Sequence, residues 1–317
     1  MTDSGLRQEC NMIRLESIRK EYDDVVAVKN LSLEINRGDI FGFIGPNGAG
    51  KTTTMRVMVG LLEPTQGQVY VDGQPINKDD PAFRRRIGYM PDFFSLYDEL
   101  RVWEYLDFFG EAYGISDRPR RIDEVINLMD LSGKRNEFIA NLSRGMKQRL
   151  GIGKTLLHDP DILVLDEPAA GLDPAARIGL RDVVRKLAAQ GKTTIISSHI
   201  LTELSDMCNT IGIIQKGVMV ESGKIDDIVS RIQAKKILRL DMIGNREQAA
   251  EFVKTCSGVD FVTVKDNVIE IGFSGKREDI PELHKRLIVN NVQVVSFYEH
   301  RQNLEEIFMS LSVKEVS

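Results

Sequence analysis

Phe41-Gly42-Phe43-Ile44-Gly45-Pro46-Asn47-Gly48-Ala49-Gly50-Lys51-Thr52-Thr53 is a short apolar strand that runs directly into the pattern G-x-x-x-x-G-K-T. Glycines at positions 45, 48 and 50 let the backbone turn tightly, so that successive N–H groups point at phosphate oxygens. The helix that follows adds its positive end. The pattern predicts a phosphate-binding loop, and we expect nucleotide contacts from Gly45, Pro46, Asn47, Gly48, Ala49, Gly50, Lys51, Thr52 and Thr53.

Two side chains of this loop carry chemistry. Lys51 is placed to reach the β- and γ-phosphates and is a candidate catalytic residue. Thr52 offers a hydroxyl to Mg²⁺, which takes few protein oxygens when it is bound with a nucleotide. A glycine-rich turn with an incidental lysine is the alternative, but the required strand and helix both flank the motif. We therefore expect a nucleoside triphosphate and Mg²⁺ as ligands.

Length and composition describe a protein of two domains. The chain has 317 residues, 42% of them hydrophobic and 28% charged, as in ordinary globular proteins. Its net charge of −5 argues against a general nucleic-acid binder, and no nucleic-acid partner is expected. Three isolated cysteines without C-x-x-C spacing fit a reducing compartment: Cys10, Cys208 and Cys256.

Neither a signal peptide nor a membrane span is predicted. The first residues, Met1-Thr2-Asp3-Ser4, carry an acid and no following apolar run. The longest apolar runs are strand-sized, well short of the ~20 residues that a spanning helix needs. The sequence therefore predicts a cytoplasmic protein.

Residues 12–230 predict an α/β domain. Apolar alternation over residues 12–73, interrupted by the phosphate loop and a helix from 50 to about 61, predicts a strand-rich nucleotide core. Helical patterns from about 93 to 160 predict a helical insertion. Strands and helices then alternate, which is the order of a mainly parallel sheet; the strands are expected at 162–165, 193–197 and 211–215, and the helices at about 174–190, 200–208 and 225–231.

Residues 236–317 predict a smaller α+β domain, with the boundary at about 230–236. The order βαββαβ matches the ferredoxin-like arrangement, in which two helices cover one face of a four-stranded antiparallel sheet. The strands are expected at 237–240, 259–265, 268–273 and 292–298, and the helices at 246–256 and 279–290, with a terminal helix at Leu304–Leu311.

Polar side chains follow two apolar strands, at the sheet edge where the phosphate loop is expected. Asp166 is placed to hold Mg²⁺ through water, and Glu167 to orient or deprotonate the attacking water. Such a base contributes roughly 10²–10⁴-fold in rate. His199 can donate a hydrogen bond to a phosphate oxygen as a neutral ring. The alternatives are a solvent-facing acid pair and a structural histidine.

The segment Leu142-Ser143-Arg144-Gly145-Met146-Lys147-Gln148 opens a helix that Ser143 can cap, while Gly145 lets the backbone approach an anion. The segment resembles the signature motif of ABC ATPases and precedes Asp166 as it does there. Over residues 12–225 the family's other motifs follow in order. Tyr22 resembles the aromatic residue that stacks on adenine, and residues 45–52 resemble Walker A. Residues 162–166 resemble Walker B, and Glu167 resembles the catalytic glutamate. Residues 170–173 resemble the D-loop, and His199 resembles the switch histidine.

The resemblance implies an α/β fold: a P-loop ABC ATPase core with a mainly parallel sheet, an antiparallel β subdomain and a helical insertion, plus a small ferredoxin-like C-terminal domain. In that family the signature of one subunit covers the nucleotide held by Walker A of another. A second ATPase subunit is therefore implied, expected as a homodimer, with Ser143 and Gly145 toward the partner's ATP. An integral membrane permease subunit is implied as well, which places the protein peripherally on the cytoplasmic face of the cell membrane.

Two positions depart from the family's pattern. The family usually has Gln after Gly-Tyr-x-Pro, whereas Asp92 follows Gly88-Tyr89-Met90-Pro91 here. Asp92 can still accept a metal-bound water, which makes it a further candidate metal residue, but its charge opposes the nucleophile. We expect coupling to be retained and the rate altered. Arg144 replaces the commoner Gly and adds a fixed cation near a neighbouring nucleotide.

An aromatic segment, 93–105, stands out in a chain with only 7% aromatic residues. Such clusters are usually core. Because ABC proteins present a groove to a coupling helix of the membrane partner here, we expect exposed contacts from Phe94, Tyr97 and Trp103. The basic groups 84–86 and 118–121 fit solvated helix faces. Lys235, Lys236, His284 and Arg301 have no metal or nucleophile spacing. The resemblance implies a dimer-stabilising or regulatory role for the C-terminal domain, and structural padding is the alternative.

The sequence predicts an ATP-binding and ATP-hydrolysing subunit of an ABC transporter, an exporter by resemblance, which powers a membrane subunit through ATP-driven dimerisation. A soluble ABC ATPase that acts on ribosomes or DNA is the alternative, but long heptad repeats and a second G-x-x-x-x-G-K-T are missing. A purely regulatory nucleotide-binding module is disfavoured by Glu167. Cargo is not indicated, because cargo contacts belong to membrane segments.

Overall fold

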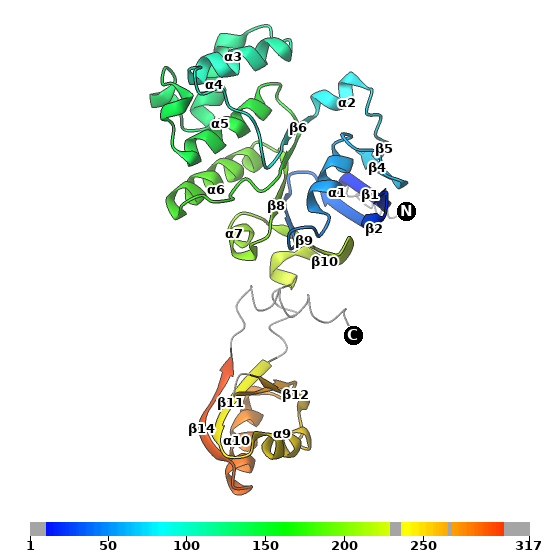
Figure 1. Ribbon diagram of the computed structural model, residues 1–317, viewed down its shortest axis with the longest axis vertical. Coiled ribbons are helices and arrows are strands. Elements are labelled where there is room, and N and C mark those ends of the chain that lie inside the picture. Colours follow the sequence, from blue (N-terminus) through cyan, green and yellow to red (C-terminus); the bar gives the residue numbers. More distant parts are fainter. Residues whose placement is uncertain (1–10, 229–235, 266–267, 301–317) are drawn as a thin grey trace, which may run out of the picture. The chain divides into compact units, whose positions relative to one another are not determined.

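The computed structural model describes residues 11–228, 236–265 and 268–300 (Figure 1). The chain divides into two compact units, Met1–Ile225 and Asp226–Ser317. The boundary expected at about 230–236 falls mostly outside the described residues and stays a prediction. Of the helix expected at 225–231, residues 225–228 are helical, and the remainder lies outside the described residues, as do Cys10, Lys235, Arg301 and Leu304–Leu311.

An antiparallel sheet forms one layer of the first unit. In β2 the side chains of Leu31, Leu33 and Ile35 are buried and their neighbours are exposed, the pattern of a sheet with one face in the core. This sheet is the antiparallel β subdomain that the resemblance implied. Its strands pair in the order β2-β1-β4-β5, with bounds β1 Asn11–Tyr22, β2 Val25–Asn36, β4 Gln66–Val71 and β5 Gln74–Pro75.

A second, mainly parallel sheet carries the edge at which the predicted site lies. Its order is β10-β9-β3-β8-β7-β6, and only β10, which pairs with β9, is antiparallel to its neighbour. Every residue of β3, β7 and β8 is buried, as expected for central strands of a parallel sheet. The bounds are β3 Ile40–Ile44, β6 Ile87–Met90, β7 Ile162–Leu165, β8 Thr193–Ser198, β9 Thr210–Gln215 and β10 Val218–Lys224.

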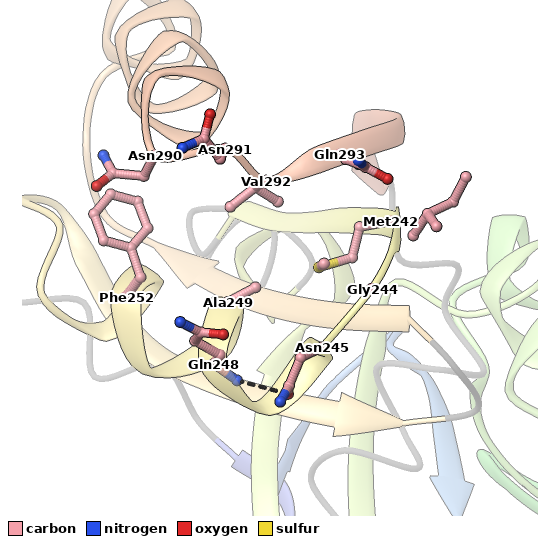
Figure 2. Close-up of a pocket in the computed structure, with 11 residues that line it drawn as sticks. Met242, Gly244, Asn245, Gln248, Ala249, Phe252, Asn290, Asn291, Val292 and Gln293 are labelled. Carbon is pink, nitrogen blue, oxygen red and sulfur yellow. Dashed lines mark hydrogen bonds between the residues drawn. The ribbon is translucent and has the colours of Figure 1, made fainter.

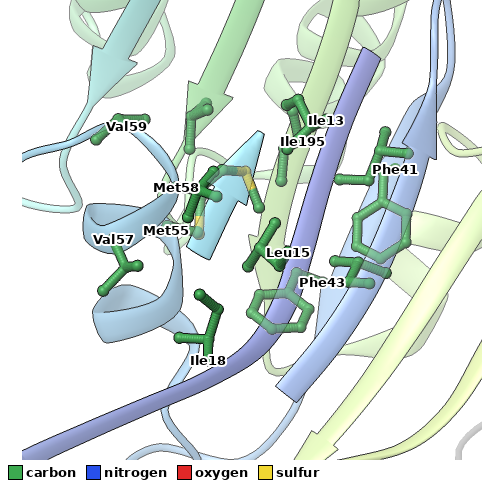
Figure 3. Close-up of a cluster of buried hydrophobic side chains, with 14 of the residues drawn as sticks. Ile13, Leu15, Ile18, Phe41, Phe43, Met55, Val57, Met58, Val59 and Ile195 are labelled. Atoms are coloured by element: carbon green, nitrogen blue, oxygen red, sulfur yellow. The ribbon is translucent and has the colours of Figure 1, made fainter. Parts of the chain in front are cut away.

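One hydrophobic core joins these two sheets through helix α1, Lys51–Met58 (Figure 3). Met55 and Met58 of α1 are fully or almost fully buried in the same cluster as Leu15 of β1 and Phe43 of β3. The helix that begins at the phosphate loop is therefore anchored from both sheets, which fixes the position of the loop.

The helices of the first unit fall into two groups (Figure 1). The helical insertion contains α3, α4 and α5, and α5 packs against α4, α6 and β6. Helices α6 and α7 pack against β8. The bounds are α2 Pro81–Arg85, α3 Val102–Ala112, α4 Arg118–Leu128, α5 Arg144–Leu156, α6 Pro174–Ala189 and α7 Leu201–Ser205.

The C-terminal unit has the ferredoxin-like arrangement that its element order predicts. Its antiparallel strands pair in the order β12-β13-β11-β14. Leu238 and Leu240 of the central strand β11 share one core with Val253 of α9 and Leu283 and Leu287 of α10, so both helices cover the same face. The bounds are β11 Lys236–Ile243, α9 Arg246–Lys254, β12 Val259–Lys265, β13 Val268–Phe273, α10 Ile280–Val289 and β14 Gln293–His300.

Candidate active site

The phosphate-binding loop lies between β3 and α1, and two of its glycines are required by space. A Cβ on Gly45 would lie 2.4 Å from the Ile214 carbonyl oxygen, and one on Gly50 would lie 2.6 Å from the Ala27 carbonyl oxygen. Gly50 also has a φ of 106°, which side-chain-bearing residues rarely adopt. The backbone therefore wraps closely around the N-terminus of α1, where the helix dipole favours an anion.

Lys51 lies inside this loop, and its side chain is only 6% exposed. Its Nζ donates to the carbonyl oxygens of Gly45, at 2.6 Å, and Pro46, at 3.3 Å. The same nitrogen lies 3.3 Å from Glu167 Oε1 as an ion pair without hydrogen-bond geometry. The structure thus brings Lys51 and Glu167 together beside the loop.

Asp166 directly follows β7 and is 1% exposed. Ser197 Oγ donates to its Oδ1 at 2.6 Å, whereas Oδ2 is buried and has no hydrogen-bond partner among the described residues. A buried carboxylate oxygen without a partner is costly, so a cation or its bound water fits there. Half-buried Thr52 adds a hydroxyl from the first turn of α1. Both groups are the hard oxygen ligands that Mg²⁺ takes.

No group of three or more His, Cys, Asp or Glu in residues 11–228, 236–265 and 268–300 is arranged to hold a metal by itself.

Glu167 is held in a strained conformation by its neighbours. Its φ of 48° lies in the left-handed region, which is uncommon for a residue with a side chain. Its backbone N–H donates to Ser197 Oγ at 2.8 Å, and its Oε2 lies 3.0 Å from His199 Nδ1. Strain of this kind persists where surrounding contacts determine it and clusters at functional sites.

His199 is 43% exposed and contacts the acid rather than standing free. Because an ionised carboxylate only accepts, Nδ1 of His199 carries the proton toward Glu167. A neutral ring then presents Nε2 as an acceptor. A neutral His199 ring can therefore donate from Nδ1 to a phosphate only after it has left Glu167. A ring that stays with Glu167 can donate from Nε2 only if it carries a second proton.

Asp92 adds a third carboxylate to this edge. It is exposed over much of its surface, yet partial burial and the negative charges of Asp166 and Glu167 raise its pKa above the ordinary value. The positive charge of Arg144 acts in the opposite direction. Acidic charge is thus concentrated where a metal is expected, while a metal contact of Asp92 itself stays a prediction.

The signature segment is placed by helix packing. Ser143 is exposed and caps α5, where its Oγ accepts from Met146 N at 3.3 Å. Gly145 is buried, and a Cβ there would lie 2.7 Å from Ala176 Cβ on α6. Glycine at this position therefore permits close approach of two helices of the same chain, a reason that the sequence did not reveal.

The exposed aromatic rings differ in part from those expected. The ring of Phe94 is half-buried against Gly151 of α5, where a Cβ would lie 2.5 Å from it, so Phe94 is mainly a packing residue. Trp103 is half-buried beside the Arg135 guanidinium. Tyr97 is 49% exposed, and Phe93, which we did not single out, is 89% exposed. Tyr22, expected at adenine, is 43% exposed at the end of β1, with Lys20 Nζ over its ring.

The basic groups pair with acids on the surface. Arg86 lies 3.0 Å from Asp161, Arg118 lies 2.8 Å from Asp107, and Arg120 lies 2.9 Å from Glu124. Exposed basic groups that pair with acids agree with the solvated faces that were expected.

The C-terminal unit carries a pocket of about 540 Å³ where β11 leads into α9 and α10 into β14 (Figure 2). None of its eleven lining residues is charged, although 28% of the chain is. The pocket therefore offers no countercharge to a triphosphate. Elsewhere in this unit Lys236 Nζ donates to the Gly275 carbonyl, His284 stacks on Phe297, and Cys256 is buried, as Cys208 is in the first unit.

No helix in the described part of the chain combines the length and the apolar character needed to cross a bilayer.

Comparisons with known proteins agree with this geometry. The family model of the ABC transporter matches residues 28–170, and the model of the C-terminal domain of DrrA1-3-like ATP-binding proteins matches residues 223–312. The linearmycin resistance ATP-binding protein LnrL of Bacillus subtilis (strain 168) is 32% identical over 305 residues, 95% of this chain and 98% of the relative. The bacitracin transport ATP-binding protein BcrA of Bacillus licheniformis is 33% identical, with 95% and 97% covered.

A solved structure, the dimeric post-hydrolysis state of the ATP-binding cassette MJ0796 bound to ADP and Pi, is similar with a TM-score of 0.60 and 26% identity. The match covers 68% of this chain and 99% of that one. The chain thus belongs to the ABC transporter family, as an ATP-binding subunit that hydrolyses ATP.

Proposed function

We propose that the chain powers export through a separate integral membrane subunit by binding and hydrolysing ATP at a site that two copies share. The observation that carries the proposal is the meeting of Lys51, Glu167 and His199 at the phosphate-binding loop. The relatives that are similar over nearly the whole chain include a bacitracin transport protein and a linearmycin resistance protein, which favours export.

Hydrolysis would proceed by in-line attack of water on the γ-phosphate. Glu167 is held by Ser197 and His199, so its carboxylate is oriented before the substrate arrives. Lys51 now donates to the carbonyls of Gly45 and Pro46, and the β- and γ-phosphate oxygens would replace these acceptors. Preorganised positive charge of this kind stabilises the charge that develops in the transition state.

Mg²⁺ would be held by Thr52 and Asp166, with Asp92 as a further candidate, and would supply neutralisation of the phosphate charge when bound. The orphaned Asp166 Oδ2 supports this assignment. The charge of Asp92 beside Asp166 and Glu167 would repel a hydroxide-like nucleophile, so we infer an altered rate with coupling retained.

Two copies would complete each site. Ser143 is exposed at the N-terminus of the thirteen-residue helix α5, where free backbone N–H groups favour an anion. The partner's ATP is the anion that we propose for Ser143 and Gly145, and Tyr22 would stack on the adenine of the chain's own ATP. The dimeric cassette of similar fold supports this assembly.

The membrane subunit would contact the surface formed by Phe93 and Tyr97, which are 89% and 49% exposed. Phe93 directly follows Asp92, so this surface lies close in sequence to the proposed hydrolysis site. Contact with a permease would place the protein peripherally on the cytoplasmic face of the membrane. Co-fractionation tests this: the chain should follow an integral membrane protein, and consistent sedimentation with ribosomes or DNA instead would overturn the transporter assignment.

The variant Glu167→Gln tests the catalytic assignment. Loss of the carboxylate should lower steady-state ATP hydrolysis roughly 10²–10⁴-fold, because a positioned base contributes about that much. Bound ATP should remain, since Lys51 and the loop are intact. Glu111→Gln changes an exposed side chain of α3, so it is the matched control and should hydrolyse normally. Normal ATP turnover by Glu167→Gln would contradict the role of Glu167 as the base.

A further inference from the structure

Arg144 does not project away from its own chain. Its Nη2 donates to the carbonyl oxygen of Ala170 at 2.9 Å. Three of its guanidinium atoms lie 2.5–2.6 Å from the position that a Cβ on Gly171 would occupy. Gly171 has a φ of +65°, a conformation that side-chain-bearing residues rarely adopt, so glycine is favoured there. The Arg144 side chain thus lies over Ala170 and Gly171, which follow Glu167.

This contact reaches Glu167 through one turn. Ala170 N donates to the Glu167 carbonyl oxygen at 3.1 Å, which closes the turn 167–170, and Arg144 holds the last carbonyl of the same turn. Glu167 begins the turn in the left-handed region. A strained residue at the start of a turn keeps its conformation only if its surroundings hold it.

We propose that Arg144 is a positioning residue for Glu167 of its own chain, because it fastens the turn 167–170 to the N-terminus of α5. The inference rests on the proposed hydrolysis by Glu167 and goes beyond it. It gives Arg144 a role in its own chain, in addition to the expectation that it places a cation near a neighbouring nucleotide. Errors near 1 Å in the placement of a catalytic group can cost about 10²-fold in rate, so such a fastening matters for turnover.

Arg144 also acts as a nearby charge, since it is the first cation that opposes the rise in the pKa of Asp92. Arg144→Lys separates the two effects. Lysine keeps the positive charge but lacks the planar fork that covers Gly171 while it donates to Ala170.

For Arg144→Gly we expect roughly a tenfold fall in kcat with KM for ATP within about twofold, because the change misplaces Glu167 and leaves the phosphate-binding loop intact. For Arg144→Lys we expect kcat nearer to that of the glycine variant than to wild type. Arg120→Ala removes another arginine, ion-paired on the exposed face of α4, and should leave both constants unchanged. Recovery of wild-type kcat by lysine would assign the effect to charge and overturn the proposal.

Mixed dimers decide whether Arg144 serves its own chain. In the first dimer Arg144→Gly and Glu167→Gln are on different chains, so the only intact Glu167 lacks its own Arg144. In the second dimer both changes are on one chain, beside a wild-type partner. Single-turnover hydrolysis is compared with a reference dimer of one wild-type and one Glu167→Gln chain.

The proposal predicts slow hydrolysis in the first dimer and reference rates in the second. The reverse pattern would place Arg144 at the partner's nucleotide, and equal rates in the two dimers would equally overturn the proposal. Failure of the reference dimer to hydrolyse its one intact site would contradict the proposed function instead, so the two failures are distinguishable.

Discussion

Ser197 is the residue that links the two acids of the site. Its hydroxyl accepts from Glu167 N and donates to Asp166 Oδ1, and the side chain is fully buried. One hydroxyl therefore positions both the proposed metal-binding acid, Asp166, and the proposed base, Glu167. It can do so because β8, which ends with Ser197 and Ser198, lies between β3 and β7 in the sheet.

Ser197→Ala should lower kcat for ATP hydrolysis by at least tenfold, because Asp166 loses its donor and Glu167 N loses its acceptor. Leaving buried polar groups unpaired costs about 1–3 kcal/mol each, and the free energy of unfolding should fall by a similar amount. The matched control is Thr194→Val on the same strand, whose buried Oγ1 has no partner among the described residues. Equal turnover in the two variants would contradict the role of Ser197.

The site residues could be predicted where a sequence motif specifies both the residue type and its position in the fold. Lys51, Asp166, Glu167 and His199 each follow a strand or open a helix that the sequence indicates, and the structure brings them to one sheet edge. Their roles as ligand or base stay predictions. The direction of Arg144 toward Ala170 was not predictable, because it depends on how α5 and the turn after β7 approach each other.

At the scale of elements, α6 and α7 are tied to the end of β8 by one buried acid. Glu203 of α7 is 8% exposed; its Oε1 lies 3.2 Å from Arg177 Nη2 of α6, and its Oε2 accepts from Ser198 Oγ at 2.8 Å. Ser198 directly precedes His199. The contact between Glu203 and Ser198 therefore helps to position His199.

Glu203→Gln should lower the free energy of unfolding by about 1–3 kcal/mol, since it removes a charge-assisted hydrogen bond and leaves Arg177 without its partner. Half-exposed Arg177 can be rehydrated, which limits the loss. Denaturant unfolding followed by circular dichroism measures the change. Glu124→Gln, in the exposed pair with Arg120 on α4, is the control and should have no measurable effect. If both variants unfold alike, Glu203 does not hold these elements together.

Element order was largely predictable, but some bounds and short elements were not. Helix α1 ends at Met58 rather than near 61, because Gly60 adopts a φ of 73°. Strand β6 has only four residues, one of them glycine, and depends on parallel pairing with β7. Strand β10 is nowhere fully buried, so its sequence shows no apolar alternation. Pairing in space, rather than local preference, defines both strands.

At the scale of the whole molecule, His158 joins the end of the helical insertion to the central sheet. Its Nε2 donates to the Ile87 carbonyl oxygen at 3.0 Å, and its ring centroid lies 4.6 Å from that of Tyr113. Burial lowers the pKa of His158 below its ordinary value of 6.5, and the backbone hydrogen bond offsets this only partly. The folded protein therefore favours the neutral ring.

The free energy of unfolding should consequently depend on pH. Below about pH 6.5 the unfolded chain binds a proton that folded His158 resists, so the stabilisation present above pH 6.5 is lost as the pH falls toward the folded pKa. His158→Gln cannot titrate and can still donate to Ile87. Unfolding measured between pH 7.5 and 5.5 should show a shallower decline in this variant, and an equal slope would exclude His158 as the cause.

The division into an ATPase core and a ferredoxin-like unit follows from the order of strands and helices. A dimer and a permease were inferred from resemblance, and the relatives support them as proposals. The central claim is that ATP brings two chains together around the site built on Lys51 and Glu167.

Light scattering of the Glu167→Gln variant in solution tests this claim most directly. With ATP and Mg²⁺ the mass should double from the 35.7 kDa of one chain, and it should return to 35.7 kDa when Lys51→Ala is added. A mass that stays at 35.7 kDa at saturating ATP and Mg²⁺ would contradict the account.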